Sequence, residues 1–264
     1  MSSSTAPLSE PSRRVVVLGA SNVMRSLGHV VDEARVAWGS PLDLLVATGY
    51  GRSYGTDSRV LGRSLPGLLD CGIWPALRDR PPSPTAALLT DVGNDILYGA
   101  SAERIVEWVE TCLDRLRPQV DELLLTQLPL AGIDALGAAR FRLVRALLFP
   151  SSSVSLAEAR AIAHEVNDRI TDAAWRHGAD VVAPDPAWYG LDPVHVRRRQ
   201  RRDAWRTILG HWTDAGEVPV QGLSGFGRIR LRALLPERRR FLGIPQQRTQ
   251  PAATFSDGSR LSLY

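Results

Sequence analysis

The chain has 264 residues, of which 44% are hydrophobic and 23% are charged. This balance is typical of a globular protein with a substantial core, and it excludes a wholly disordered chain, a fibrous repeat and a disulfide-stapled miniprotein. All 32 basic residues are arginine; residues 197–264 hold 14 of them and carry a net charge of +9, whereas residues 1–196 carry −5. The basic C-terminal quarter can therefore attract anionic substrates, lipids or nucleic acid.

The N-terminal residues 1–13 lack the apolar core of a secretion signal, and we expect them to form a disordered leader. No run of about 18 apolar residues occurs that could form a transmembrane helix. Cys71 and Cys112 lie in apolar-periodic stretches, which favours two buried thiols in a reducing cytoplasm over a single disulfide. We therefore expect a cytoplasmic protein.

Five short apolar runs, each bounded by turn residues, recur along the chain. They span residues 15–18, 42–47, 86–89, 123–125 and 181–183. Each run is too short for a helix and is apolar on both faces, which is typical of strands in a buried parallel sheet.

Helical patterns lie between these runs. Apolar residues recur on one face over 105–116, and Pro118 ends that helix. Ser155 and Glu158 form the pattern of a capping box, which predicts the start of the next helix. Weaker patterns predict helices after Ser21, after the stretch near Asp57 and after Pro193. The alternation predicts an α/β fold, a three-layer α/β/α sandwich with a parallel sheet of about five strands, in one domain over residues 14–214.

The basic segment after this domain gives weaker signals. Residues 197–202 are expected on the last helix, residues 228–232 alternate like an edge strand, and Asp257-Gly258 indicates a hairpin turn. We interpret residues 215–264 as a basic C-terminal appendage. It packs on the body or on a second subunit, which would make a homo-oligomer.

The carboxyl ends of parallel strands are where such sheets bind ligands, so chemistry is sought there. Ser21 follows the first run and precedes a helix, where its hydroxyl would be exposed beside the helix N-terminus. The tripeptide alone indicates no more than a helix cap. A nucleotide-binding turn would require G-x-G-x-x-G, which is absent here.

A serine nucleophile needs a base, and five histidines are available. His195 alone lies in a loop-rich segment just past a strand end. Asp192 precedes it by three residues, a spacing that lets a carboxylate reach Nδ1 of the imidazole and leave Nε2 for the serine. A helix start with Asp192 as its cap explains the aspartate but leaves the histidine unexplained.

Two further strand ends supply candidate oxyanion donors. Asn94 follows the third run, and its side-chain amide could donate to an oxyanion, although a turn or cap would explain it equally well. Gly49 or Gly51 follows the second run, and either could offer an unobstructed backbone N–H.

The order of these blocks resembles the SGNH hydrolases, also called the GDSL esterase/lipase superfamily. Ser21 matches the first block, Gly51 the second, Asn94 the third, and Asp192 with His195 the final Asp-x-x-His block. The resemblance covers roughly residues 14–212. It departs from the family at Ala20, where the family usually has Asp, and at Val92, where it usually has Gly.

The resemblance implies a flavodoxin-like strand order and a catalytic triad of Ser21, His195 and Asp192. It also implies an oxyanion hole made by Ser21, Gly51 and Asn94. No cofactor is implied, and a metal is unsupported because His164-Glu165 lacks the second histidine of H-E-x-x-H.

The sequence thus predicts a serine esterase that hydrolyses acyl esters, including acetyl esters, of small molecules. An acyltransferase would need the same triad. A non-catalytic binding module with a basic tail for nucleic acid or anionic lipid is the alternative of another class, and the complete set of triad residues argues against it. We therefore do not expect nucleic acid as a partner.

Overall fold

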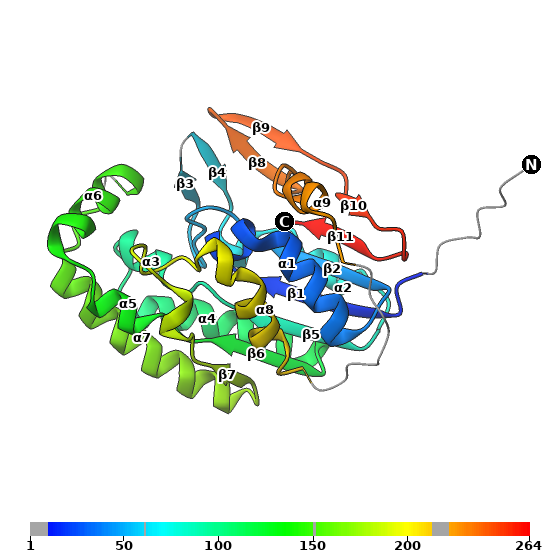
Figure 1. Ribbon diagram of the computed structural model, residues 1–264, viewed down its shortest axis with the longest axis horizontal. Coiled ribbons are helices and arrows are strands. Elements are labelled where there is room, and N and C mark those ends of the chain that lie inside the picture. Colours follow the sequence, from blue (N-terminus) through cyan, green and yellow to red (C-terminus); the bar gives the residue numbers. More distant parts are fainter. Residues whose placement is uncertain (1–9, 61, 150–151, 213–221) are drawn as a thin grey trace, which may run out of the picture.

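The computed structural model describes residues 10–60, 62–149, 152–212 and 222–264. Most of the expected leader and the expected boundary at 214–215 lie outside these ranges. A seven-stranded sheet forms the middle layer, in the order β10-β11-β2-β1-β5-β6-β7, and helices cover both of its faces (Figure 1). The three-layer α/β/α architecture predicted from the sequence is confirmed.

The five predicted strands form one parallel block within this sheet. They are β1 (Arg13–Leu18), β2 (Leu42–Ala47), β5 (Thr85–Leu89), β6 (Glu122–Thr126) and β7 (Asp180–Val182). Their order, β2-β1-β5-β6-β7, is the flavodoxin-like order. Each pair is parallel, so that Val16 of β1 lies between Leu45 of β2 and Ala87 of β5. All five carboxyl ends therefore lie at one edge of the sheet.

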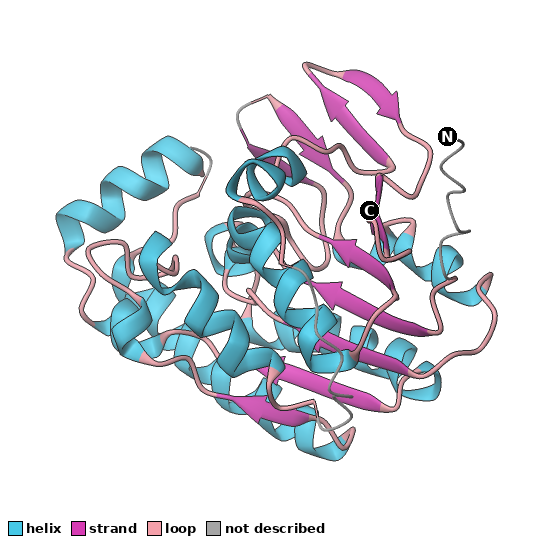
Figure 2. Ribbon diagram, turned by 45° about the vertical axis from the view of Figure 1, so that its right-hand side comes forward, coloured by secondary structure: helices cyan, strands magenta, loops and turns pink. Residues whose placement is uncertain are grey.

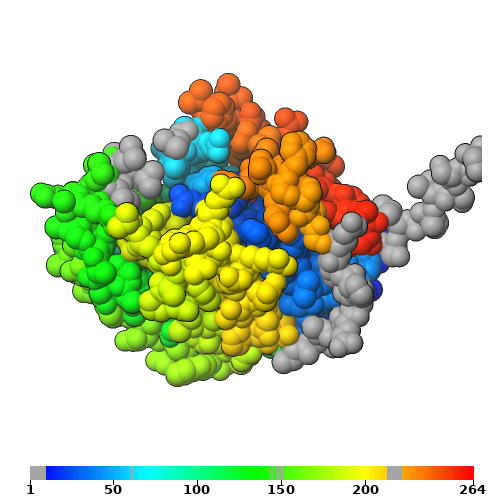
Figure 3. Space-filling view, viewed as in Figure 1, coloured from blue at the N-terminus to red at the C-terminus, as the bar shows by residue number. Residues whose placement is uncertain are grey.

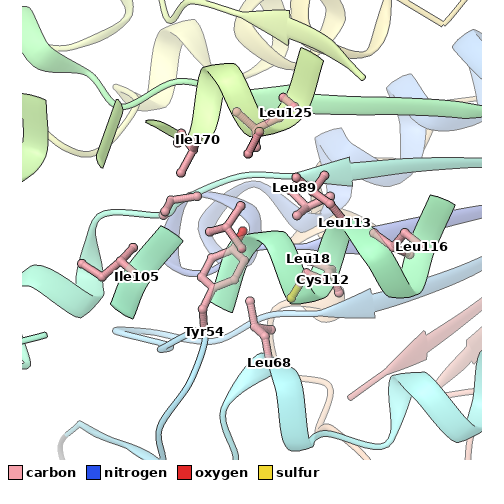
Figure 4. Packing of buried hydrophobic residues seen from close by; sticks show 14 of the residues in the cluster. Leu18, Tyr54, Leu68, Leu89, Ile105, Cys112, Leu113, Leu116, Leu125 and Ile170 are labelled. Atoms are coloured by element: carbon pink, nitrogen blue, oxygen red, sulfur yellow. The ribbon is translucent and has the colours of Figure 1, made fainter. Parts of the chain in front are cut away.

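Successive side chains of β1 enter different cores. Val16 and Leu18 point into one core with α2 (Ile73–Arg78), α4 (Ala102–Leu116) and α7 (Leu156–Arg176), as Figure 4 shows for Leu18. Val15 and Val17 point into the other core, which α1 (Ser21–Trp38) and α8 (Arg201–Leu209) cover. Each fully buried aliphatic side chain contributes about 1.5–3 kcal/mol relative to its exposure. The two-sided burial explains why these strands are continuous apolar runs.

The helix boundaries follow local signals. The predicted capping box is present at α7, where the Ser155 side chain accepts from the backbone N–H of Glu158 and the Glu158 side chain accepts from that of Ser155. Ser101 caps α4 in a similar way, and Pro118 lies in the short 3₁₀ turn that ends it. Between β6 and α7 the chain forms two further helices, α5 (Leu130–Asp134) and α6 (Ala138–Leu148).

The end of the expected appendage completes the central sheet. β10 (Ala253–Thr254) and β11 (Arg260–Leu263) are joined by the predicted Asp257-Gly258 turn, and β11 pairs with β2 in parallel. The sheet therefore has seven strands, where the sequence predicted about five. These strands extend the sheet beyond β2, and Figure 2 shows the C-terminus of the chain at this side of the sheet.

One prediction in the basic segment is wrong. Residues 228–232 are not an edge strand: they belong to α9 (Gly225–Leu231) and its C-cap. Ser224 caps this helix, Leu231 is buried, and the guanidinium of Arg228 binds Asp32 of α1 with an N–O distance of 2.8 Å. Gly28 makes the packing feasible, because a Cβ there would lie 2.5 Å from Cγ of Arg228.

A second sheet contains four antiparallel strands. They are β3 (Ser58–Val60), β4 (Arg63–Leu65), β8 (Arg238–Phe241) and β9 (Ile244–Gln247). Strands β3 and β4 directly follow Asp57, and the helix that comes after this stretch is α2, which begins at Ile73. The hairpin turn between β8 and β9 exposes Leu242 and Ile244.

Candidate active site

Ser21 begins α1 at the carboxyl end of β1, the middle strand of the seven-stranded sheet. Ala20 is the N-cap residue, and Ser21 is the first helical residue and only 8% exposed. The helix N-terminus lies at this serine and favours negative charge beside it. Ser21 is therefore not the helix cap that the tripeptide alone indicates, because Ala20 holds the cap position and no side chain caps the helix. The Ser21 hydroxyl is engaged elsewhere.

Ser21, His195 and Asp192 form one hydrogen-bonded chain. The Ser21 hydroxyl lies 2.8 Å from Nε2 of His195, and Nδ1 of His195 lies 2.7 Å from Oδ2 of Asp192. With its proton on Nδ1, the imidazole donates to the carboxylate and offers Nε2 to the hydroxyl. The structure thus brings together three residues that lie up to 174 positions apart in the sequence.

The Asp192 carboxylate is held in its charged form. Burial opposes its ionisation, but hydrogen bonding and attraction from His195 and a bond from the Val194 N–H outweigh burial, so the pKa of Asp192 is lowered. Arg25 adds to this effect, with Nη1 lying 3.6 Å from Oδ2 of Asp192. A charged carboxylate at Nδ1 stabilises the imidazolium that forms when Nε2 takes a proton.

Asn22 fastens the histidine loop to α1. Its side-chain amide donates to the carbonyl of Val194, and its side-chain oxygen accepts from the N–H of Val196, each over 2.9 Å. Both backbone neighbours of His195 are thereby tied to the residue that follows Ser21. Asn22 therefore fixes the separation between the serine and the histidine.

Asp91 in turn holds the turn that carries the serine. Its carboxylate accepts from the backbone N–H groups of Ala20 and Asn22 at 2.9 Å and from the Asn22 side chain at 2.8 Å. Its backbone is left-handed, with φ of 62°, a conformation that aspartate tolerates better than most residues. No local pattern in the sequence predicts this role of Asp91. The related signal is Ala20, at a position where the family that the sequence resembles usually has Asp.

The glycine turn after β2 lies next to Asn94. The Asn94 side-chain amide donates to the carbonyl of Arg52 over 3.1 Å, and the Tyr98 hydroxyl donates to the carbonyl of Gly51 over 2.8 Å. Gly51 has a φ of 62°, and a Cβ there would lie 2.6 Å from Val60, so a glycine is required at this position. At Gly49, a Cβ would lie 2.3 Å from Cδ1 of Leu65, so that the leucine side chain would have to move.

Two buried charged residues support this turn. The Arg52 side chain is fully buried and donates to the carbonyls of Thr48, Pro66 and Tyr264. Asp95 is also fully buried and accepts from the Ser53 hydroxyl and the Tyr54 N–H. Burial raises the pKa of Asp95 to about 6, although the two hydrogen bonds oppose the shift.

A cavity of about 530 Å³ opens at the serine. Ser21, Asn94 and His195 lie in its wall. Most of the remaining wall is apolar. One part follows the ends of β5 and β6 or comes from α5, α6 and α7, including Leu128, Ile133, Leu136, Phe141, Leu156 and Ala159. Another part comes from residues 182–208, including Trp188, Tyr189, Trp205 and Ile208. The volume is within the range of about 300–1,000 Å³ that is usual for small-molecule sites.

Other candidate features are accounted for structurally. His164 lies 3.0 Å from Asp134 on an exposed helix face, and Cys71 and Cys112 are buried free thiols. Among the described residues, no group of three or more His, Cys, Asp or Glu side chains is arranged to hold a metal ion. Within the same ranges, no helix has both the length and the apolar character needed to cross a membrane.

Comparison with known proteins identifies the fold. No family model matches the sequence, and no curated protein sequence matches it either. A carbohydrate acetylesterase from Sinorhizobium meliloti superimposes with a TM-score of 0.51 at 12% identity, over 75% of this chain and 97% of that one. An inhibitor-bound aryl esterase from M. smegmatis gives a TM-score of 0.51 at 11% identity, over 76% of this chain and 98% of the other. The chain therefore has the α/β/α fold of these two esterases.

Proposed function

We propose that the protein is a serine hydrolase of the SGNH type that cleaves acyl esters. The observation that carries this proposal is the hydrogen-bonded chain from Ser21 through His195 to Asp192 at the mouth of an apolar cavity. The fold similarity to two esterases supports the general class of reaction.

In the first step, Oγ of Ser21 attacks the ester carbonyl while Nε2 of His195 takes the hydroxyl proton. The carbon–oxygen bond to the alcohol then breaks, and His195 passes the proton to the leaving oxygen. Water, deprotonated by His195, then attacks the acyl carbon. The bond from that carbon to Oγ of Ser21 breaks, and His195 returns the proton to Oγ, which releases the acid. Asp192 orients the imidazole and stabilises its charged form throughout. These steps need no cofactor or metal.

The oxyanion is held by the N–H groups of Ser21 and Gly51 and by the side-chain amide of Asn94. Asp91 takes the N–H groups on both sides of Ser21 and leaves that of Ser21 itself for the reacting carbonyl. Such donors act on charge that develops in the transition state, where each contributes about 3–4 kcal/mol.

The cavity points to an acyl group larger than acetyl. An acetyl group has three heavy atoms and would fill roughly 90 Å³ at about 30 Å³ each, the volume of a water molecule. The cavity of about 530 Å³ would leave most of its apolar wall uncovered by such a group. We therefore infer that esters of medium-chain acids are better substrates than acetates.

The test is hydrolysis of p-nitrophenyl octanoate together with labelling by a fluorophosphonate. Ser21→Ala and His195→Ala should each remove nearly all turnover, and the double variant should be little worse than either one, because the residues act as a unit. Ser256→Ala and His211→Ala are matched controls at exposed positions and should keep both activity and labelling. Labelling that persists in Ser21→Ala, or strictly additive losses, would refute the assignment.

A further inference from the structure

Four arginines from separate parts of the chain gather beside the triad. We call them the arginine group: Arg25 in α1, Arg198 and Arg201 around the start of α8, and Arg232 at the end of α9. Nη1 of Arg201 donates to the Arg25 carbonyl over 3.0 Å, and Nη2 of Arg232 donates to the Tyr50 hydroxyl over 3.5 Å. Since Arg25 contacts Asp192, and Tyr50 directly precedes Gly51, the group connects the triad with the glycine turn.

The group carries excess positive charge. Burial lowers the pKa of Arg201, and repulsion from Arg25, Arg232 and Arg198 lowers it further, whereas Tyr50 opposes the shift. In the described ranges, Asp192 is the one carboxylate in an ion pair with any of the four, and it is already bonded to His195. Like charges held together in this way favour the binding of an anion.

The arginine group and the apolar cavity meet at Arg25, which also lines the cavity. Arg198, Arg201 and Arg232 are not among the lining residues, whereas the apolar wall comes largely from the ends of β5 and β6 and from α5–α7. Figure 3 shows the yellow segment around residues 190–209 between the green helices α5–α7 on one side and the orange α9 on the other. An ester bound at Ser21 can thus place one substituent in the apolar cavity while the other lies beside Arg25 and the rest of the arginine group.

We propose that the substrate is an acyl ester whose alcohol portion carries an anionic group, with the acyl chain in the apolar cavity and the anion on the arginine group. The guanidinium fork binds phosphate or carboxylate oxygens with two parallel hydrogen bonds, which gives the alcohol a defined orientation. That orientation places the leaving oxygen near His195, which returns the proton taken from Ser21. This inference rests on the proposed hydrolase function.

The experiment compares octanoyl esters of three alcohols that differ in charge: glycerol, glycerol phosphate and lactate. We expect kcat/KM for at least one anionic ester to exceed that for the glycerol ester by about tenfold or more, mainly through KM. Arg198→Gln combined with Arg232→Gln should lower the anionic-to-neutral ratio by about 10- to 100-fold. Arg104→Gln, at an exposed arginine on α4 across the sheet, is the control for loss of a distant charge and should leave the ratio unchanged.

The outcomes separate this inference from the function on which it rests. A preference for the phosphate or for the lactate ester supports the inference and names the anion. Equal rates on charged and neutral esters overturn it while leaving the esterase intact. A ratio that is insensitive to both arginine substitutions also overturns it. Absence of turnover on all three esters and on p-nitrophenyl octanoate would refute the proposed function instead.

Discussion

Replacing Asp91 should loosen the turn that carries the nucleophile. Its carboxylate accepts three hydrogen bonds of 2.9 Å or less at the start of α1. A hydrogen bond to a charged group contributes about 1.5–3 kcal/mol, although bonds that share one carboxylate do not add fully. Asp91→Gly removes all three without a penalty at the left-handed φ. We expect it to lower the free energy of unfolding by about 3–4 kcal/mol and Asp91→Asn by about half of that.

Asp91→Gly should slow catalysis because it displaces the catalytic residues, not because it weakens substrate binding. Asp91 holds Asn22, and Asn22 holds both neighbours of His195. A shift of about 1 Å in such groups can lower a rate about 100-fold. In Asp91→Gly we therefore expect kcat to fall about 10- to 100-fold, with KM changed by less than about threefold.

Urea unfolding and steady-state kinetics on p-nitrophenyl octanoate measure the two effects. Asn22→Ala and the double variant complete a cycle, and the two losses should not add, because the residues act in one hydrogen-bond network. Two results would contradict this account of Asp91. One is a free energy of unfolding for Asp91→Gly within about 0.5 kcal/mol of that of the unsubstituted protein. The other is a rise in KM while kcat stays constant.

Three further expectations concern the oxyanion donor, a buried acid and the cavity. Asn94→Ala should lower kcat about 10²- to 10³-fold with a smaller change in KM, and a loss confined to KM would make Asn94 a substrate-binding residue. Burial raises the pKa of Asp95 from 3.8 to about 6, because the folded state favours the neutral carboxyl. The free energy of unfolding is therefore highest below pH 4 and falls as the pH rises through 6. Unfolding across that range should show a fall of about 3 kcal/mol that Asp95→Asn lacks; parallel curves would contradict the shift. Ala159 lies in the cavity wall, and Ala159→Leu should lower kcat/KM for the octanoate ester relative to the acetate ester about tenfold or more. Ala161→Leu, on the exposed face of the same helix, is the control and should leave this ratio unchanged. An unchanged ratio in Ala159→Leu would place the acyl chain elsewhere.

The parts of the fold that depend on local patterns could be predicted from the sequence. The five parallel strands are buried on both faces, and this burial produces the continuous apolar runs that identified them. Ser21, Asn94 and His195 could be singled out because each follows a strand end, and those ends meet at one edge of the sheet. The spacing from Asp192 to His195 is local as well.

The features that were missed depend on contacts between distant segments. Asp91 acts on residues about 70 positions earlier in the chain, and Asn22 acts on Val196, 174 positions later. The segment 228–232 alternates over only five residues, which fits a strand as well as one face of a helix. Its helical state is favoured by the ion pair to Asp32 and the burial of Leu231, neither of which a local pattern reveals.

The position of β11 has a consequence for biosynthesis. Its neighbour in the sheet is β2, and contacts between the two segments span 217 positions, as from Leu42 to Ser259. A chain emerging from the ribosome at about 5–20 residues per second exposes the edge of β2 until β11 has been translated. The same segment brings the Tyr264 carbonyl to the buried guanidinium of Arg52, directly after Gly51. The glycine turn at the candidate site therefore gains this support only after β11 has been made, and premature termination before β11 would leave an unpaired strand edge prone to aggregation.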